Sequence, residues 1–123
     1  MEKPHKKLKA WQLAMEIAQD IYRITQQLPA EEKYGLLSQM RRSATSIPSN
    51  IAEGAARQSS KEFVQFLHIA QASLAELDTQ CELCCRLEYL VHEKDALEQK
   101  LLETDKVLSG LIRSLKSKSS PLS

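Results

Sequence analysis

Residues 46–54 read Ser-Ile-Pro-Ser-Asn-Ile-Ala-Glu-Gly, at the centre of the stretch from Ser38 to Leu77 that decides the fold. Apolar residues recur around this segment every three or four positions, a spacing typical of a helix face. They are Leu36, Met40, Ala44, Ile47, Ile51 and Ala55. Pro48 interrupts the backbone hydrogen bonding, but hydroxyls of the neighbouring Ser and Thr residues can bond the freed carbonyls. We therefore expect one helix over residues 33–57, kinked near Pro48 rather than broken.

A polar strip runs beside this apolar face. It consists of Gln39, Ser46, Asn50, Glu53 and Arg57. The simplest interpretation of Glu53 and Arg57, four residues apart, is an ion pair along the helix. Asn50 and Gln39 would need hydrogen-bond partners if they are buried. Gly54 falls inside the apolar sector, where the lack of a side chain would let a neighbouring backbone come close.

Three further helices are predicted on either side of this one. Residues 8–28 carry two apolar stripes, one through Trp11 and one through Ile17, and Pro29 ends the helix. Ser59 and Glu62 form a capping box before a helix over 60–91, and a turn leads into a helix over 95–116. Residues 1–7 and 117–123 have the composition of flexible tails. The sequence therefore predicts one all-α domain over residues 1–123, an up-down-up-down antiparallel four-helix bundle.

The charge of the chain is nearly balanced. Seventeen Lys and Arg stand against sixteen Asp and Glu, for a net charge of +1, so no overall field attracts nucleic acid or an anionic membrane. The basic residues are nevertheless concentrated near the two ends of the chain: Lys3, Lys6, Lys7 and Lys9, then Lys106, Arg113, Lys116 and Lys118. No apolar run reaches the ~20 residues of a membrane span, and no signal peptide is recognisable. Three cysteines, an odd number within five positions, argue against a disulfide framework and for a reducing compartment. We expect a cytoplasmic protein.

Metal and catalytic sites are not favoured by the sequence. Cys81, Cys84 and Cys85 lack the further ligands that a structural zinc site needs. The first two fall on the apolar stripe of their helix, where cysteine packs as a small apolar residue, so we expect core packing rather than metal or redox chemistry. No phosphate-binding loop, nucleophile motif or paired carboxylates are present. We expect no enzyme activity, cofactor, metal or small-molecule substrate.

Six basic residues are candidates for contacts with phosphate groups. They are Arg41, Arg42, Arg57, Lys6, Lys7 and Lys9. Lysine and arginine side chains supply such contacts in nucleic-acid complexes. The alternative is that the arginines lie on a solvated or subunit-contacting surface, because the balanced charge does little to attract an RNA. The residues themselves leave both interpretations open.

The motif Gln39-x-x-Arg42-Ser-Ala-x-Ser-Ile-Pro-Ser-Asn-Ile-Ala-Glu-Gly54, with Arg57, Glu62-Phe63 and Glu76-Leu77 after it, resembles the four-helix-bundle family of 23S rRNA intervening-sequence proteins. The resemblance covers nearly the whole chain. It implies that Gln39, Ser46, Pro48, Asn50, Glu53, Gly54 and Glu76 are structural family positions. It also implies a bacterial homopentamer, and it offers no catalytic residues. Accessory proteins of diversity-generating retroelements are a related, strongly basic group, from which this chain departs in its charge.

Two functional hypotheses follow from the residues and the resemblance together. The first is a non-enzymatic oligomeric bundle that associates with ribosomal RNA or a ribonucleoprotein. The second is a protein-interaction scaffold without direct nucleic-acid binding, which the two apolar stripes of residues 8–28 would serve.

Overall fold

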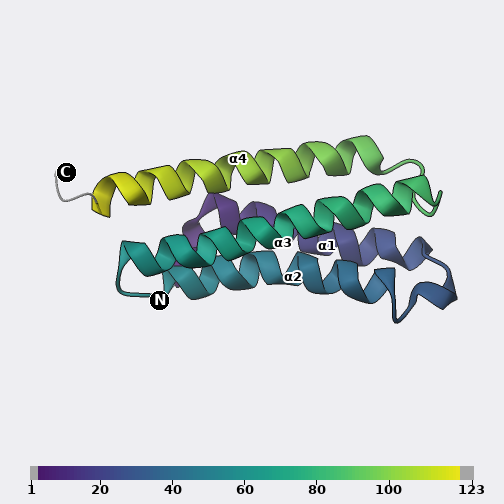
Figure 1. Ribbon diagram of the computed structural model, residues 1–123, viewed down its shortest axis with the longest axis horizontal. Coiled ribbons are helices and arrows are strands. Elements are labelled where there is room, and N and C mark those ends of the chain that lie inside the picture. The colour runs from purple at the N-terminus through teal and green to yellow at the C-terminus, as the bar shows by residue number, and fades with distance from the viewer. Residues whose placement is uncertain (1–2, 120–123) are drawn as a thin grey trace.

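The fold is all-α, as the sequence predicts. The computed structural model describes residues 3–119, and its main elements are α1 (Lys9–Ile24), α2 (Leu36–Ala55), α3 (Ser60–Arg86) and α4 (Lys94–Ser119). Successive helices run in opposite directions, with α3 between α2 and α4 in the view of Figure 1. Helix α1 closes the bundle by packing on α2 and α4. Short 3-10 turns lie at Pro4–Lys7, Thr25–Gln27 and Ala30–Glu32. Among residues 3–119, none of the helices combines the length and the apolar character that a membrane crossing requires.

The two apolar stripes of the first helix differ in how far they enter the core. The stripe through Leu13, Ile17, Ile21 and Ile24 is buried, and small alanines beside it are buried as well. The second stripe is only partly covered: Ala18 is buried, and Leu8 and Trp11 pack against the edge of the core. Met15 and Tyr22 of the same stripe are 39% and 45% exposed. Small alanine side chains allow the neighbouring helices to approach closely, so the alanine side of α1 faces inward.

Helix α2 continues through Pro48 without interruption. Pro48 itself is buried, and so is Ala44, whose carbonyl loses its helical donor. The nearby hydroxyls of Thr45 and Ser49 bond the carbonyls of Arg41 and Thr45, at 3.0 and 2.8 Å, and not the carbonyl of Ala44. The unbroken helix agrees with the expected continuity, and the kink stays a prediction.

Helix α3 begins as predicted and ends five residues earlier than residue 91. The Glu62 backbone N–H donates to Ser59 Oγ at 3.2 Å, the first bond of a capping box, and the Ser59 hydroxyl donates to Glu62 Oε1 at 3.1 Å. At the other end Glu88 adopts a positive φ of 64°, and the Tyr89 N–H reaches back to the Cys84 carbonyl at 2.9 Å. This is a Schellman ending. Glycine usually marks such a stop, and its absence here explains the over-long prediction.

The other helix limits also differ from the expected ranges by a few residues. Helix α1 gives way to a 3-10 turn at Thr25, three residues before the expected end at 28. Helix α2 begins at Leu36, not 33, because the Glu32 carboxylate accepts the Leu36 N–H at 3.2 Å. Helix α4 begins at Lys94, one residue before the expected 95, and extends to Ser119, beyond the expected 116. The expected flexible tails fall partly on residues 1–2 and 120–123, which lie outside the described residues.

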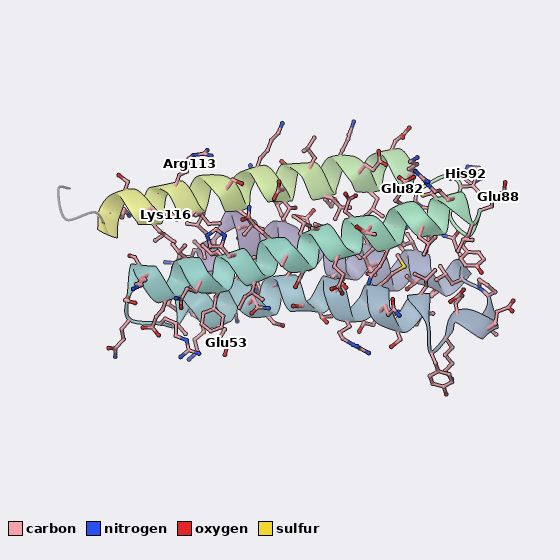
Figure 2. The ribbon with its side chains drawn as sticks, in the orientation of Figure 1. Glu53, Glu82, Glu88, His92, Arg113 and Lys116 are labelled. Carbon is pink, nitrogen blue, oxygen red and sulfur yellow. The ribbon has the colours of Figure 1, made fainter. Side chains whose placement is uncertain are left out.

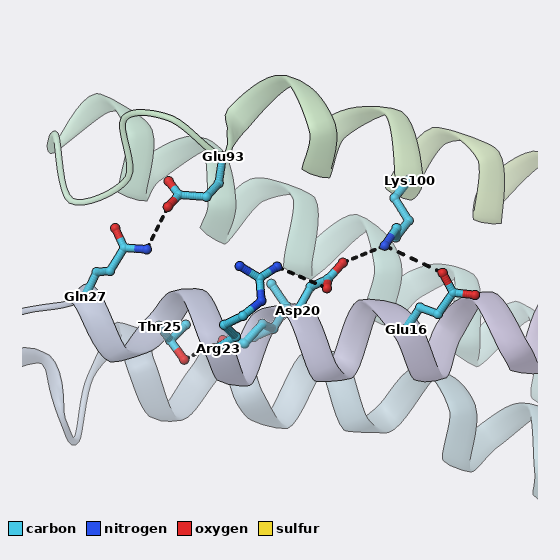
Figure 3. Close-up of polar contacts among 8 residues, drawn as sticks. Glu16, Asp20, Arg23, Thr25, Gln27, Glu93 and Lys100 are labelled. Atoms are coloured by element: carbon cyan, nitrogen blue, oxygen red, sulfur yellow. Dashed lines mark hydrogen bonds and ion pairs between the residues drawn. The ribbon is translucent and has the colours of Figure 1, made fainter.

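Ion pairs and hydrogen bonds connect α4 to α1 (Figure 3). Lys100 Nζ lies 2.7 Å from Asp20 Oδ2 and 3.6 Å from Glu16 Oε1. The hydrogen bond to Asp20 is the main reason that the pKa of Lys100 is raised. Near the turn after α1, Gln27 Nε2 donates to Glu93 Oε1 at 2.7 Å, and this bond lowers the pKa of Glu93. Charged and polar side chains therefore contribute to the contact between α1 and α4.

Candidate nucleic-acid interface

The antiparallel arrangement gathers basic residues from distant parts of the chain at one end of the bundle. The start of α1, the end of α2, the start of α3 and the end of α4 all meet there. This half, which we call the basic end, comprises residues 3–16, 46–73 and 107–119. It carries nine Lys and Arg against three Asp and Glu: Lys3, Lys6, Lys7, Lys9, Arg57, Lys61, Arg113, Lys116 and Lys118 against Glu16, Glu53 and Glu62.

The opposite half is acidic. Residues 17–45 and 74–106 carry eight Lys and Arg against twelve Asp and Glu. Figure 2 shows the contrast, with Arg113 and Lys116 near one end of the bundle and Glu82 and Glu88 at the other. The net charge of +1 therefore hides a strong separation of charge along the bundle axis. A phosphate backbone would be attracted to one end and repelled by the other.

The few acidic residues of the basic end are occupied by local contacts. Glu53 accepts an ion pair from Arg57 at 3.3 Å, as the spacing predicts. Glu62 serves the capping box, and Glu16 lies near Lys100 of α4. These carboxylates lower the net positive charge of the basic end but leave it strongly positive.

The basic side chains of this end differ in whether contacts within the protein already engage them. The Arg57 guanidinium also lies 4.8 Å from the centre of the Phe66 ring, which fixes its direction. Lys9 is near Glu103 at 4.0 Å, a weak surface pair. Lys61 and Arg113 are exposed and make no hydrogen bond or ion pair with any residue between 3 and 119. Lys6 and Lys7 are exposed as well and form no ion pair within the described part of the chain, so these four side chains are well placed to contact phosphate.

Arg41 and Arg42 lie in the other half, away from the remaining four candidates. Arg41 is a structural brace: its Nε donates to Thr25 Oγ1 at 3.0 Å, its Nη2 donates to the Tyr22 carbonyl at 3.2 Å, and it stacks 4.6 Å from the Tyr22 ring. Arg42 is exposed. The structure thus divides the six predicted residues into two groups, with Lys6, Lys7, Lys9 and Arg57 together at the basic end.

Two serines of α2, Ser46 of the polar strip and Ser43 nearby, hydrogen-bond α3, and we call this line of contacts the seam. Ser46 Oγ lies 2.8 Å from Ser73 Oγ, and Asn50 Nδ2 donates to the Ser46 carbonyl at 2.8 Å. Ser43 Oγ donates to Glu76 Oε1 at 2.6 Å. Half-buried Asn50 thus has the partners that burial demands, whereas Gln39 is exposed and needs none. The seam fixes the register of α2 against α3, a structural role.

Gly54 is the point where α2 and α3 approach most closely. A Cβ atom at this position would lie 2.8 Å from Phe66 Cβ and 2.9 Å from Phe63 Cδ1. Real Cβ atoms keep larger distances, so glycine is the residue that fits there. The prediction that Gly54 admits a neighbouring backbone is therefore consistent with the geometry, and the neighbour is α3.

The three cysteines lie at the acidic end, largely inside the bundle. Cys81 and Cys84 are buried, and Cys84 Sγ packs 3.4 Å from Met40 Sδ. Burial raises the pKa of the Cys81 thiol to about 12 and that of Cys84 to about 11, which keeps both protonated. Within residues 3–119, no three His, Cys, Asp or Glu side chains are grouped so as to hold a metal ion.

Sequence reasoning missed Lys61 as a partner of the chain-end lysines. Its position at the start of α3 places it at the same end as the start of α1 and the end of α4 once the bundle topology is drawn. Arg113 was recognisable as part of a basic cluster, but only the topology joins that cluster to the first one. The order and direction of the helices could have predicted that these basic residues lie at one end, whereas no local motif indicates it.

Comparisons with known proteins found a family model and solved structures that are similar to this chain. A family model described as "23S rRNA-intervening sequence protein" matches residues 6–110. A crystal structure from Bacteroides thetaiotaomicron, of a protein of unknown function from the S23 ribosomal protein family, superimposes with a TM-score of 0.77 and 28% sequence identity. The match covers 84% of this chain and 97% of that one. No curated protein matches the chain.

Proposed function

This chain belongs to the 23S rRNA-intervening sequence protein family, and on that premise we propose that it is a non-enzymatic, self-associating helical bundle that binds structured RNA or a ribonucleoprotein through its basic end. The observation that supports the proposal is the excess of six positive charges in one half of the bundle, nine against three. Cationic side chains that release the counterions of an RNA backbone supply most of the affinity of sequence-independent binding.

The basic end suits phosphate contacts rather than the reading of bases. Its described cations are lysines and arginines, and two aromatic residues of α3, Phe63 and Phe66, are half-buried where α2 approaches. Sequence-specific recognition of single-stranded RNA usually stacks bases on exposed aromatic rings. We therefore propose recognition of RNA shape and charge rather than of a particular sequence.

The test is the salt dependence of RNA binding. A fluorescently labelled, folded fragment of 23S rRNA is titrated with the protein, and fluorescence anisotropy gives the affinity at several salt concentrations. Each phosphate contact contributes a slope of about −0.9 in a plot of log affinity against log salt for duplexes. Lys61→Gln combined with Arg113→Gln should flatten the slope by about two and lower the affinity at least tenfold near 0.1 M salt.

The matched control removes the same charge from the other half. Arg23→Gln combined with Arg86→Gln changes the net charge equally but breaks only surface ion pairs with Asp20 and Glu82. The control should keep the slope of the unaltered protein. Equal losses in both variants would mean that only net charge matters, and no salt-sensitive binding at all would refute the RNA proposal.

A scaffold without RNA binding is the second candidate, favoured by the exposed stripe of α1. Met15 and Tyr22 present apolar surface that the bundle does not cover. Such exposed residues at helical spacing are typical of a protein contact. If the RNA titration fails while the protein captures one defined protein through this stripe, the scaffold is the better description.

A further inference from the structure

The groove between α1 and α2 combines cationic and aromatic side chains. It has a volume of about 420 Å³, and it is lined by three cations, Lys33, Arg41 and Arg42, together with the tyrosines Tyr22 and Tyr34. None of the described residues in its lining is acidic. The groove therefore offers positive charge and aromatic surface at one place, although it lies in the acidic half of the bundle.

The carboxylates of the acidic half lie mainly away from this groove. Nine of its twelve acidic residues belong to residues 74–106, that is to α3, α4 and the turn between them. Glu32, beside Lys33 in the chain, is engaged elsewhere, because its carboxylate accepts the Leu36 N–H at 3.2 Å and the Tyr89 hydroxyl at 3.1 Å. Glu31 is exposed on the same turn and outside the lining. The local field in the groove is therefore positive.

Arg41 carries a charge that the protein does not neutralise. Its guanidinium is half-buried, and its acceptors are the Thr25 hydroxyl and the Tyr22 carbonyl, at 3.0 and 3.2 Å, which are both neutral. Among residues 3–119 no carboxylate pairs with it, and its Nη1 has no acceptor. A buried charge without a counterion is costly. An anion bound in the groove would supply that counterion.

Two more cations at the groove are available to a ligand. The exposed side chain of Arg42 makes no hydrogen bond or ion pair in the described part of the chain. Lys33 Nζ has one contact, over the Tyr34 ring at 5.5 Å from its centre. Arginine and lysine in this state suit phosphate oxygens, arginine through two parallel hydrogen bonds and lysine as a point charge.

The tyrosine rings of the groove are open to a planar partner. Tyr34 is 88% exposed, and within residues 3–119 its ring meets no other ring and no cation except Lys33. Tyr22 is 45% exposed, and the Arg41 guanidinium lies 4.6 Å from the centre of its ring, which holds the ring in place. An exposed aromatic ring beside cations is the usual platform on which an unpaired base stacks.

We propose that this groove binds an unpaired nucleotide of an RNA strand, with the base stacked on Tyr34 and the phosphates on Arg42, Lys33 and Arg41. The proposal deepens the proposed function and rests on it, since it adds a contact for single-stranded RNA to the duplex-binding basic end. Cations alone would suit any anion, and the open aromatic ring beside them selects a nucleotide. Stacking of this kind tolerates every base, because every base has a π-face.

The distance between the two surfaces fits one RNA with a helix and a single-stranded arm. Arg42 and Gly54 are twelve residues apart on α2, which corresponds to about 18 Å along the helix axis. About five or six stacked nucleotides, at roughly 3.4 Å each, cover that length. A duplex held at the basic end could thus place its unpaired continuation in the groove, and the two weak contacts would reinforce each other.

Replacement of Tyr34 tests the stacking contact. The probe is a fluorescently labelled oligouridylate of about eight nucleotides, and fluorescence anisotropy gives its affinity. Tyr34→Ala should weaken binding at least fivefold, because each stacked base contributes substantially to affinity. Tyr34→Phe keeps the ring and should bind like the unaltered protein. No binding of the oligouridylate by the unaltered protein, no effect of Tyr34→Ala, or an equal loss in Tyr34→Phe would each overturn the proposal.

Replacement of Arg42 tests the phosphate contact. Arg42→Gln should flatten the plot of log affinity against log salt for the oligouridylate by about 0.7, the contribution of one phosphate contact on a single strand. Arg23→Gln is the matched control, because it removes the same charge from the same half but lies outside the lining and breaks only a surface ion pair with Asp20. Equal slopes for the two variants would refute a specific role of Arg42.

A blunt RNA duplex, which has no unpaired nucleotide, separates this proposal from the basic-end proposal. Lys61→Gln with Arg113→Gln should weaken duplex binding and keep the effect of Tyr34→Ala on the oligouridylate. If Tyr34→Ala weakens duplex and oligouridylate equally, the groove does not select unpaired nucleotides and the inference fails, whatever the basic end does. If the duplex is not bound but Tyr34→Ala still weakens oligouridylate binding, the basic-end proposal fails and the groove stands.

Free uridine monophosphate distinguishes the two sources of a nucleotide. Added as a competitor, it should displace the oligouridylate only at a concentration at least tenfold above that of unlabelled oligouridylate, because a strand adds further phosphate contacts. Displacement at equal concentrations would make a free nucleotide the ligand and would overturn an RNA strand as the occupant of the groove.

Discussion

Replacing Gly54 with alanine should destabilise the bundle, although alanine is the better helix former. Gly54 is buried on α2 at its closest approach to α3. The new Cβ would lie 2.8 Å from Phe66 Cβ, 2.9 Å from Phe63 Cδ1 and 3.2 Å from the Phe63 carbonyl oxygen. Two of these atoms belong to or adjoin the backbone of α3, so a simple side-chain rotation cannot relieve the overlap.

The change in the free energy of unfolding caused by Gly54→Ala is the sum of two opposing contributions. Carbon atoms pack at about 3.5–4.0 Å, so α2 and α3 must separate by several tenths of an ångström, and such overpacking costs about 1–3 kcal/mol. The greater helix propensity of alanine returns about 1 kcal/mol. The expected net loss is therefore up to about 2 kcal/mol, which corresponds to a fall in Tm of up to roughly 8 °C for a chain of this length.

Thermal unfolding followed by circular dichroism measures the effect, at one protein concentration so that the proposed self-association affects both proteins equally. Gly110→Ala is the matched control. Gly110 lies within α4, and a Cβ there would meet only Arg113 Nη2, at an ordinary 3.8 Å. The control should raise the stability by up to about 1 kcal/mol. A Gly54→Ala protein that melts at or above the unaltered protein would refute the close-approach reasoning.

Three smaller predictions concern single contacts. Ser43→Ala removes the 2.6 Å bond to Glu76 and should lower the free energy of unfolding by about 1–2 kcal/mol; an unchanged urea midpoint would contradict it. Lys100→Met removes the pair with Asp20, which raises the pKa of Lys100 above its usual 10.5. The pair with Asp20 stabilises the fold fully below the pKa that Lys100 has in the unfolded chain, and this stabilisation is lost as the pH rises through the higher pKa of the folded protein. The difference in Tm between the unaltered protein and Lys100→Met should therefore narrow above about pH 10. A difference in Tm that stays constant to about pH 11 would contradict the prediction. Cys81, with a pKa of about 12, should be alkylated at pH 8 roughly a thousandfold more slowly than an exposed thiol, and equal labelling before and after unfolding, measured by mass spectrometry, would disprove this.

The sequence predicts those contacts correctly that form between residues three or four positions apart on one helix. The capping box at Ser59 and Glu62 works through atoms three residues apart, and the Glu53–Arg57 pair lies four residues apart on one helix. Both depend only on helical geometry. The end of α3 was misjudged because Glu88 adopts the left-handed conformation that glycine usually signals. Apolar residues continue past that point, so the periodic pattern alone predicts a longer helix.

The first helix shows the limit of periodicity. Its two apolar stripes are equally regular, and the choice of the stripe through Ile17 over the one through Met15 depends on which face meets α2 and α4. Hydrophobic spacing describes one helix at a time, whereas burial is a property of the neighbours. The exposed stripe was visible in the sequence, but its exposure was not.

The sequence by itself determined the all-α class, the number of long helices, the family and the close approach at Gly54, because each of these depends on residues within a few turns of one another. Only the tertiary structure decided that Arg41 is a brace against Tyr22, and that Lys6, Lys61 and Arg113 share one end. The physical reason is that charge adds up in space and not along the chain. An almost neutral sequence, folded back on itself three times, places its positive charge at one end and its negative charge at the other.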